Sequence, residues 1–416
     1  MLRSRKAAAA VAGLAAAALA VSVSTASAAV DPANSDSALT EGIDAYTAAY
    51  PKITPTAAQL AFQQQDARKQ LYDQLAKDPS SFGGASFDPP SGVLTVAATT
   101  DAAAAAAQQT GAKLGVKVRP VLVKRSYDEL TAQADTIRRG ELGKAVRGNV
   151  GIDVLSNDVV ASAPDSQIAS LQPMADKYGV RLVVNDNRPA TADAGCTSRA
   201  ACDWTIRGGS MLWSGFAGNN VCSVGFTARN AANQRFTYTA GHCSSGSGVT
   251  WGTGGQTIGP MGASMNFGPV DASVISVTNS WFTGDLGGEL YNQFAAGKTV
   301  PVKGVAPTLS FIWTGDVVCL AANFTQPSGN SFCGVVGSVV DPFERGLVRV
   351  DGLDACPGDS GGAWYWLPSS GNRFAYGMHS RSDFGCHGSN GGSHSWFSAL
   401  PTVKAFLTPA LNVETR

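Results

Sequence analysis

The sequence predicts a chain in two differently built parts, a mixed α/β segment followed by an all-β domain of short strands. All 8 Cys, all 8 Trp and all 4 His lie at or beyond Cys196, together with 34 of the 47 Gly. Apolar residues recur at helical spacing mainly before Cys196, whereas short apolar or alternating runs separated by Gly, Asn, Ser and Pro dominate after it. Strands this short and this regularly spaced are typical of an all-β sandwich or a pair of barrels.

The first 28 residues have the pattern of an export signal. Basic residues near the N-terminus precede an Ala/Val/Leu run over 7–23, and Ala26-Ser27-Ala28 forms a small-residue cleavage site. A membrane anchor is the alternative, but the run is mostly Ala and no stop-transfer charges follow it. We therefore expect residues 1–28 to be removed and the remaining chain to be secreted and extracellular, with no membrane contact after export.

Residues 29–195 carry helix and strand signals in mixed order. The string Thr56-Ala-Ala-Gln59 predicts a capping box that opens a helix, and the polar run over 185–195 predicts a linker where a protease would cut. No His, no Cys and no arrangement of acids in this segment indicates chemistry. The further predicted helices are 101–107, 128–139 and 166–178, and the predicted strands are 92–97, 116–124, 150–155 and 180–184.

Residues 196–416 carry the strand signals, with helical spacing only over 399–407. Eight Cys in an exported chain imply disulfides. A zinc site is disfavoured, because no Cys pair has the two-residue spacing of zinc ligands, so we expect no metal ion and no cofactor. The predicted strands are 222–227, 236–239, 272–278, 335–340, 347–350 and 373–379, and neighbouring cysteines predict the pairs Cys196–Cys202, Cys222–Cys243, Cys319–Cys333 and Cys356–Cys386.

Two motifs carry the residues of a nucleophilic site, Thr239-Ala-Gly-His-Cys243 and Gly358-Asp-Ser-Gly-Gly362. A serine hydroxyl becomes a strong nucleophile when a neighbouring base takes its proton, and that base needs a carboxylate to orient it. We assign Ser360 as the nucleophile and His242 as the base. The glycines allow a sharp turn that would aim the N–H groups of Gly358 and Ser360 at a developing oxyanion.

Asp271 is the predicted third member of this catalytic triad. It precedes an apolar strand, so its carboxylate would be buried at the strand's end. Asp285 and Asp316 are weaker alternatives, because Gly flanks both on predicted surface turns.

Three strings, Cys222-Ser-Val-Gly-Phe226 and the two motifs above, resemble those of the chymotrypsin-like serine proteases. The resemblance covers 196–416 and is strongest to the secreted bacterial branch that includes α-lytic protease and the streptogrisins; residues 80–188 more loosely resemble the prosegments of that branch. It implies two six-stranded antiparallel β-barrels with the triad at their seam, His242 and Asp271 from the first and Ser360 from the second. It also implies that 29–195 is a prosegment, both folding assistant and inhibitor, and that 196–416 is the protease domain.

The residues expected to set substrate preference predict different preferred side chains. His379-Ser380-Arg381-Ser382 resembles the string of the glutamyl endopeptidases, which implies that His379 and Ser382, with Arg381, bind a substrate carboxylate, while the Ser380–Ser382 backbone pairs with the substrate. However, only Pro357 separates Cys356 from Gly358, where those relatives have a longer loop. Asp354 stands where the trypsins carry the acid that selects Lys or Arg. Preferences for Glu, for Lys or Arg, and for apolar residues therefore stay open.

Other function classes fit the sequence less well. The 31 basic and 31 acidic side chains balance, which disfavours binding to nucleic acid or anionic membrane. Gly358-x-Ser360-x-Gly362 also matches the nucleophile elbow of esterases, but that fold needs the His after the Ser and a helix behind it. A catalytically inactive, protease-like binding protein is the remaining alternative. We expect a monomer whose partners are protein or peptide substrates and its own prosegment.

Overall fold

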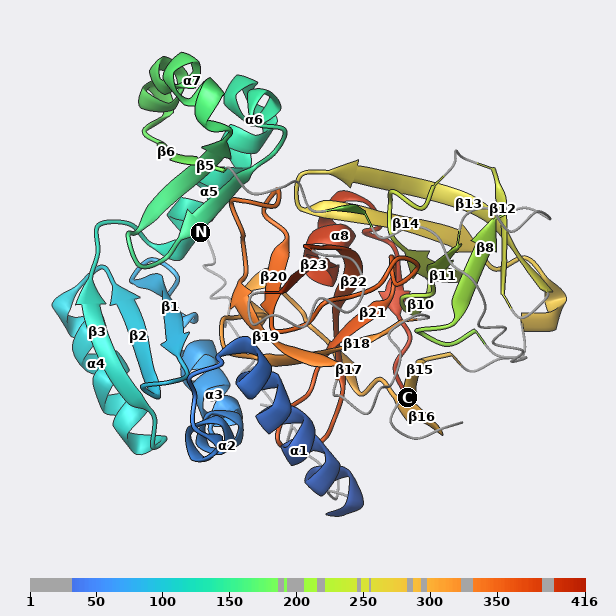
Figure 1. Ribbon diagram of the computed structural model, residues 1–416, viewed down its shortest axis with the longest axis horizontal. Helices are drawn as coiled ribbons and strands as arrows, with labels where there is room; N and C mark the ends of the chain where they lie inside the picture. The colour runs from blue at the N-terminus through green and yellow to red at the C-terminus, as the bar shows by residue number, and fades with distance from the viewer. Residues whose placement is uncertain are drawn as a thin grey trace, which may run out of the picture.

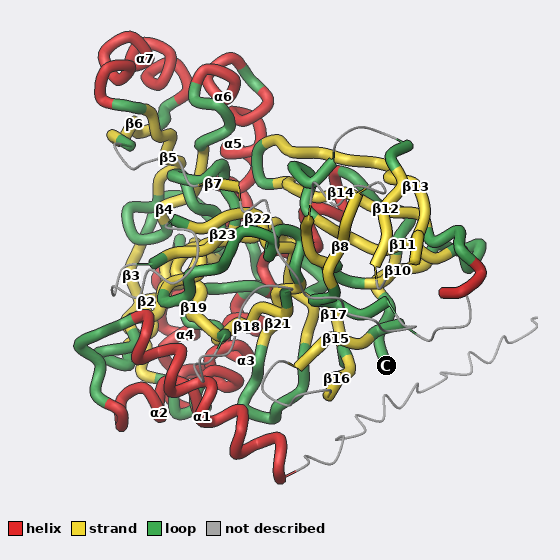
Figure 2. The backbone as a smooth tube through the Cα atoms, turned by 45° about the vertical axis from the view of Figure 1, so that its right-hand side comes forward, coloured by secondary structure: helices red, strands yellow, loops and turns green. Residues whose placement is uncertain are grey.

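The computed structural model consists of two small α/β lobes on one side of a large β domain (Figure 1). Turned by 45°, it shows helices concentrated in the two lobes and strands in the β domain (Figure 2). No helix within the described parts of the chain is both long and apolar enough to cross a membrane. The structure describes residues 32–185, 191–192, 206–214, 221–244, 248–253, 256–282, 287–292, 298–322, 332–383 and 393–416.

The first lobe, residues 32–122, contains four helices and a three-stranded sheet. The predicted capping box at Thr56 is wrong: Thr54 is the N-cap and accepts the Ala57 N–H, because Pro55 supplies a first helical residue that has no N–H to satisfy. Strand β2 pairs antiparallel with β1 and parallel with β3, so α4 is the crossover between β2 and β3. The elements are α1 (Pro32–Ala49), α2 (Pro55–Gln63), α3 (Gln65–Leu75), β1 (Phe82–Asp88), β2 (Val93–Ala98), α4 (Asp101–Lys113) and β3 (Lys117–Leu122).

The second lobe, residues 127–185, repeats this plan with an antiparallel hairpin, a crossover helix and a parallel third strand. Its first helix begins at a true capping box, in which Ser126 and Glu129 satisfy each other's backbone N–H groups. Predicted elements lie at α4, α5, α7, β2, β3, β4 and β6, whereas α1, α6, β1 and β5 were not predicted. The elements are α5 (Tyr127–Arg139), α6 (Glu141–Ala145), β4 (Val150–Asp153), β5 (Asp158–Ala163), α7 (Asp165–Tyr178) and β6 (Arg181–Val184).

The β domain begins with an eight-stranded sheet in the order β24-β10-β11-β14-β13-β12-β8-β9. It curls around an apolar core that includes Trp251, Ile258 and Phe282. Among the described residues this sheet is an open path, so the closure of the first predicted barrel stays a prediction. The strands are β8 (Met211–Ser214), β9 (Val221–Ser223), β10 (Thr227–Arg229), β11 (Arg235–Thr239), β12 (Thr250–Thr253), β13 (Gln256–Phe267), β14 (Val270–Ser276) and β24 (Asn412–Val413).

A second sheet closes on itself. Pairing runs β22-β21-β18-β19-β20-β23, and β23 pairs back with β22, which gives the predicted six-stranded barrel. Trp364 and Phe397 stack in its core. The predicted all-β domain is therefore confirmed, with one closed barrel and one half-barrel. The strands are β17 (Gly304–Val305), β18 (Val317–Ala321), β19 (Cys333–Ser338), β20 (Val348–Asp351), β21 (Ala363–Trp366), β22 (Phe374–Ser382) and β23 (His394–Ala399), followed by the predicted helix α8 (Leu400–Phe406).

Two of the predicted disulfides are present, Cys222–Cys243 and Cys319–Cys333. Cys356 is also disulfide-bonded. Cys196, Cys202 and Cys386 lie outside the described residues, so the pairs that include them stay predictions.

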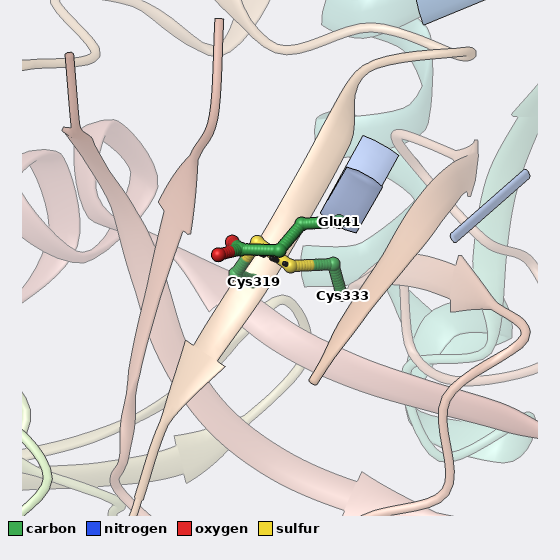
Figure 3. Close-up of side chains that lie close together, drawn as sticks. All are labelled: Glu41, Cys319 and Cys333. Carbon is green, nitrogen blue, oxygen red and sulfur yellow. Dashed lines mark hydrogen bonds between the residues drawn. A yellow bond between two sulfur atoms is a disulfide. The ribbon is translucent and has the colours of Figure 1, made fainter. Parts of the chain in front are cut away.

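Helix α1 lies along β19 of the closed barrel (Figure 1). It brings the buried Glu41 to the Cys319–Cys333 disulfide, with Oε2 3.8 Å from the sulfur of Cys333 (Figure 3). This is a close group of potential metal ligands. Both sulfurs are committed to the disulfide, however, so they offer no thiolate and the group is not a metal site.

The first lobe also makes polar contacts with the barrel through α3. The buried Gln65 amide accepts the Val317 N–H at 3.1 Å and donates to the Leu367 carbonyl at 2.6 Å, so it satisfies both backbone groups. Nearby, Lys69 lies over the Phe311 ring. Burial raises the pKa of Asp316 to about 6, even though Lys69 and a hydrogen bond from the Tyr376 hydroxyl stabilise its charge.

The second lobe holds the loop between β19 and β20, residues 339–347. Its backbone and side chains contact four successive parts of this loop, so the loop and the lobe form one packed unit. The hydrogen bonds run from Ile152 N to Val340 O (3.2 Å), from Ser162 Oγ to Pro342 O (2.8 Å), from Asn185 Nδ2 to Phe343 O (3.2 Å) and from Arg345 N to Asn149 Oδ1 (3.2 Å).

Candidate active site

The loop after β11 carries His242 towards the start of β14. Strands β11 and β14 pair directly, which places Asp271 beside this loop. Gly241 is required by space, because a Cβ there would lie 2.0 Å from the Met265 carbonyl oxygen. The pairing of β11 with β14 in the open sheet therefore brings together two of the three predicted residues.

His242 and Asp271 make two hydrogen bonds. The His242 backbone N–H donates to Asp271 Oδ1 at 2.8 Å, and Nδ1 lies 2.7 Å from Oδ2. The Asp271 side chain is fully buried. A carboxylate at Nδ1 fixes the tautomer in which Nδ1 carries the proton, so Nε2 is left as an acceptor.

Ser360 lies in a tight turn of the closed barrel, and its Oγ is 2.8 Å from His242 Nε2. Gly358 and Gly361 adopt φ values of +98° and +85°, and a Cβ on Gly361 would lie 2.2 Å from Thr239 Oγ1. The Asp359 carboxylate accepts the Cys356 N–H at 2.8 Å, which closes the turn from the other side. Ser360, His242 and Asp271 thus form a continuous line of hydrogen bonds across the two sheets.

The charge of Asp271 is stabilised despite its burial. Burial by itself would raise the pKa of this carboxyl, but His242, Arg345 and the Ser380 hydroxyl together hold it well below its ordinary value. Asp271 therefore stays ionised while it orients the imidazole, and its charge is available to stabilise an imidazolium.

Ser380, whose backbone is expected to pair with the substrate, places its side chain against the triad. Its hydroxyl donates to Asp271 Oδ2 at 2.5 Å, so this side chain supports the triad instead of facing the substrate. Ser398 accepts the Asp271 backbone N–H at 2.7 Å. Neither contact was predicted, because both join segments more than 100 residues apart and no local motif marks them.

The other predicted specificity residues lie close to the same end of β22. His379 is buried, and its Nδ1 accepts the Trp364 Nε1–H at 3.2 Å. Ser382 donates to the Ala355 carbonyl at 3.2 Å. Arg381 forms an ion pair with Glu344 at 3.2 Å. Asp354 is half-buried beside Ala355.

Of the alternative acids, Asp316 does not join this site. Asp316 is buried under Tyr376, in the contact with the first lobe. Asp285 lies outside the described residues.

A short strand from the end of the α/β part lies beside the triad. Strand β7 (Thr191–Ala192) pairs antiparallel with β22, with Ala192 opposite Arg381 and Thr191 opposite Ser382. One side of β22 pairs with β23 along its length. The other side pairs first with β21, whose pairing ends at Ala363, and then with β7. That edge leads directly to Ser360.

No protein-family model matches the chain, and no curated protein matches it. A Nocardiopsis protease is similar over 51% of this chain and 100% of its own length, with 26% identity and a TM-score of 0.39. An α-lytic protease homologue is similar over 49% of this chain and 98% of its own (24% identity, TM-score 0.36). A mutant of human heparin binding protein is similar over 52% of this chain and 94% of its own length, with 16% identity and a TM-score of 0.31. TM-scores below 0.5 do not show the family or the reaction.

The depressed pKa of Asp271 predicts a pH-dependent contribution to stability. Its ionised form is favoured by folding, so the contribution is complete above the unfolded pKa of about 3.9 and is lost as pH falls towards the folded value. In a Ser360→Ala background, the cost of Asp271→Asn in unfolding free energy should shrink by more than about 1 kcal/mol between pH 6 and pH 2.5. Urea unfolding of both chains measures this. A cost independent of pH would contradict the assignment.

Proposed function

We propose that this chain is the precursor of a secreted, monomeric serine endopeptidase that hydrolyses peptide bonds through an acyl-enzyme intermediate. The observation that carries the proposal is the line of hydrogen bonds from Ser360 Oγ to His242 Nε2 (2.8 Å) and from Nδ1 to the buried Asp271 (2.7 Å). In this arrangement a general base touches the nucleophile and is itself oriented by a carboxylate.

The proposed reaction follows from these contacts. His242 Nε2 takes the Ser360 proton while Oγ attacks the carbonyl carbon, and Asp271 stabilises the imidazolium. The N–H groups of Gly358 and Ser360 stabilise the oxyanion, each worth about 3 to 4 kcal/mol in the transition state. His242 then protonates the leaving amine, which leaves an acyl-enzyme on Ser360. A water molecule that gives its proton to His242 attacks this acyl group, and the acid is released while Ser360 recovers its proton.

Residues 29–195 are proposed as the prosegment, in the roles of folding assistant and inhibitor. Two contacts support this role. Gln65 satisfies backbone groups of the barrel, and β7 lies on the β22 edge where an extended substrate would add as a strand. The bond presented to Ser360 would lie C-terminal to Ala192, because β7 runs towards the nucleophile.

The peptidase proposal is better supported than an esterase. An esterase nucleophile elbow turns from a strand into a helix, whereas the chain after Ser360 continues into strand β21. An inactive binding protein would not need the complete hydrogen-bonded triad.

A preference for Glu at the scissile residue, the residue whose carbonyl Ser360 attacks, is the first choice. The resemblance of His379-Ser380-Arg381-Ser382 to the string of the glutamyl endopeptidases supports this choice. Because His379 Nδ1 accepts from Trp364, the proton of a neutral ring is on Nε2. Arg381 is neutralised by Glu344 and is a weaker donor to a substrate carboxylate. A preference for Lys or Arg is the second choice, because the carboxylate of Asp354 would attract a basic side chain.

Covalent labelling tests the enzyme proposal. A fluorophosphonate should form one adduct, located on Ser360 by peptide mass spectrometry, because among the described residues this is the serine whose hydroxyl contacts a histidine base. His242→Ala should slow labelling by at least about 100-fold, the usual scale of general-base catalysis. Ser395→Ala, which removes a buried barrel hydroxyl that donates to the Leu353 carbonyl and makes no hydrogen bond to the triad, is the control and should label normally. No adduct on Ser360 would refute the proposal.

Peptide substrates test the side-chain preference. Three peptides that differ only in Glu, Arg or Phe at the scissile residue should be cleaved with kcat/KM highest for Glu. Asp354→Asn should raise the rate for Glu if its charge opposes a substrate carboxylate. Negligible Glu cleavage beside efficient Arg cleavage would reverse the two choices.

A further inference from the structure

Arg345 lies next to the triad without belonging to it. It comes from the loop between β19 and β20, and its side chain is only 12% exposed. One amino nitrogen, Nη1, donates to Asn266 Oδ1 at 2.7 Å, and Asn266 is the partner of Asp271 across the β13–β14 hairpin. The other, Nη2, is 4.0 Å from Asp271 Oδ2, which is longer than a hydrogen bond.

One edge of the Arg345 guanidinium has no hydrogen-bond acceptor among the described residues. Nε and Nη2 are both buried and make no hydrogen bond within the described part of the chain. These two nitrogens form the edge that binds a carboxylate through two parallel N–H···O bonds. Buried donors without acceptors are rare in folded proteins, so this edge indicates a ligand that the precursor does not supply.

The neighbouring charges do not fill this edge. Glu344 pairs with Arg381 at 3.2 Å, and Asp271 is committed to His242 and Ser380. Burial, with Arg381 nearby, lowers the pKa of Arg345 to about 10, so the guanidinium remains charged at neutral pH. The positive charge therefore faces the site ready to attract an anion.

Arg345 also lies beside the proposed path of the substrate. Arg345 and Ser380 both approach Asp271 Oδ2, and Arg381 Nε donates to Ser380 Oγ at 3.3 Å. The guanidinium is therefore next to the part of β22 that carries β7. In that register Ala192 is opposite Arg381.

The register identifies which substrate residue would be nearest. The Gly361 N–H donates to the His379 carbonyl at 2.8 Å, so the Ser360 turn is level with His379 and Ser380 on β22. A substrate strand paired like β7 would have its scissile residue opposite Ser380. The residue before the scissile one would then lie opposite Arg381, where the prosegment has an alanine, which offers no acceptor.

We propose that Arg345 is a specificity-determining residue that binds the carboxylate of a substrate Asp or Glu directly before the scissile residue. The proposal rests on the peptidase function above and adds a second recognition position to it. The prosegment's second lobe holds the Arg345 backbone through Asn149, so the site would become available to substrates once that lobe leaves.

The test uses the full chain after maturation and peptides that differ only in Glu, Gln, Lys or Ala before a fixed, best-cleaved scissile residue. The wild type should cleave the Glu peptide with kcat/KM about 10- to 100-fold above the Gln peptide, in line with a paired charge-assisted contact. Arg345→Gln should reduce this Glu/Gln ratio to near one, and Arg345→Glu should favour Lys. Arg349→Gln, which removes a nearby arginine paired with Asp351, should leave the ratio unchanged.

Each contrary outcome has a distinct meaning. Equal Glu and Gln rates in the wild type, or a ratio that survives Arg345→Gln, would overturn the proposal while leaving the peptidase intact. Failure to cleave any peptide, together with no fluorophosphonate adduct, would overturn both. If Arg345→Gln does not fold, Arg345→Lys keeps the charge but loses the paired edge, and an undiminished ratio in that variant would also overturn the proposal.

Discussion

The buried negative charge of Asp271 is the constraint on which the rest of the site depends. An ionised carboxylate removed from water is costly unless donors surround it. Here the donors come from distant segments: His242 after β11, and Ser380 on β22. Ser398 on β23 fixes the backbone of Asp271 itself. The half-barrel and the closed barrel must therefore meet in one arrangement, and that arrangement brings Ser360 within reach of the imidazole.

The α/β part contacts the β domain at places that this arrangement needs. The first lobe shares an apolar core with the barrel, and Gln65 pairs with its backbone. The second lobe holds the β19–β20 loop, which carries Arg345 to Asp271. Such a partner can stabilise the closely packed seam during folding and, through β7, occupy the edge of β22 that a substrate would need. One set of contacts thus accounts for both proposed roles of the prosegment.

Site residues could be predicted from the sequence where their role depends on the residues next to them in the chain. His242 and Ser360 were predicted because their glycine-rich turns are required for close approach, and Asp271 because it begins a buried strand. The contacts that the Ser380 hydroxyl and Arg345 make with Asp271 were not predicted, because they depend on how β22 and the β19–β20 loop pack. Helix α1 was missed because small and polar residues obscure its periodicity, and the capping box failed because Pro55 shifts the helix start.

Self-cleavage tests the central claim most directly, because it requires the triad to be assembled in the precursor and the β7 edge to lead to Ser360. The full chain and its Ser360→Ala variant are expressed and secreted in parallel, and each product is characterised by intact mass and N-terminal sequencing. The account predicts that the wild type appears as two polypeptides with a new N-terminus between Asp193 and Cys196, whereas the variant remains a single chain. Cleavage of the variant at the same place and rate, or an uncut wild type, would contradict it.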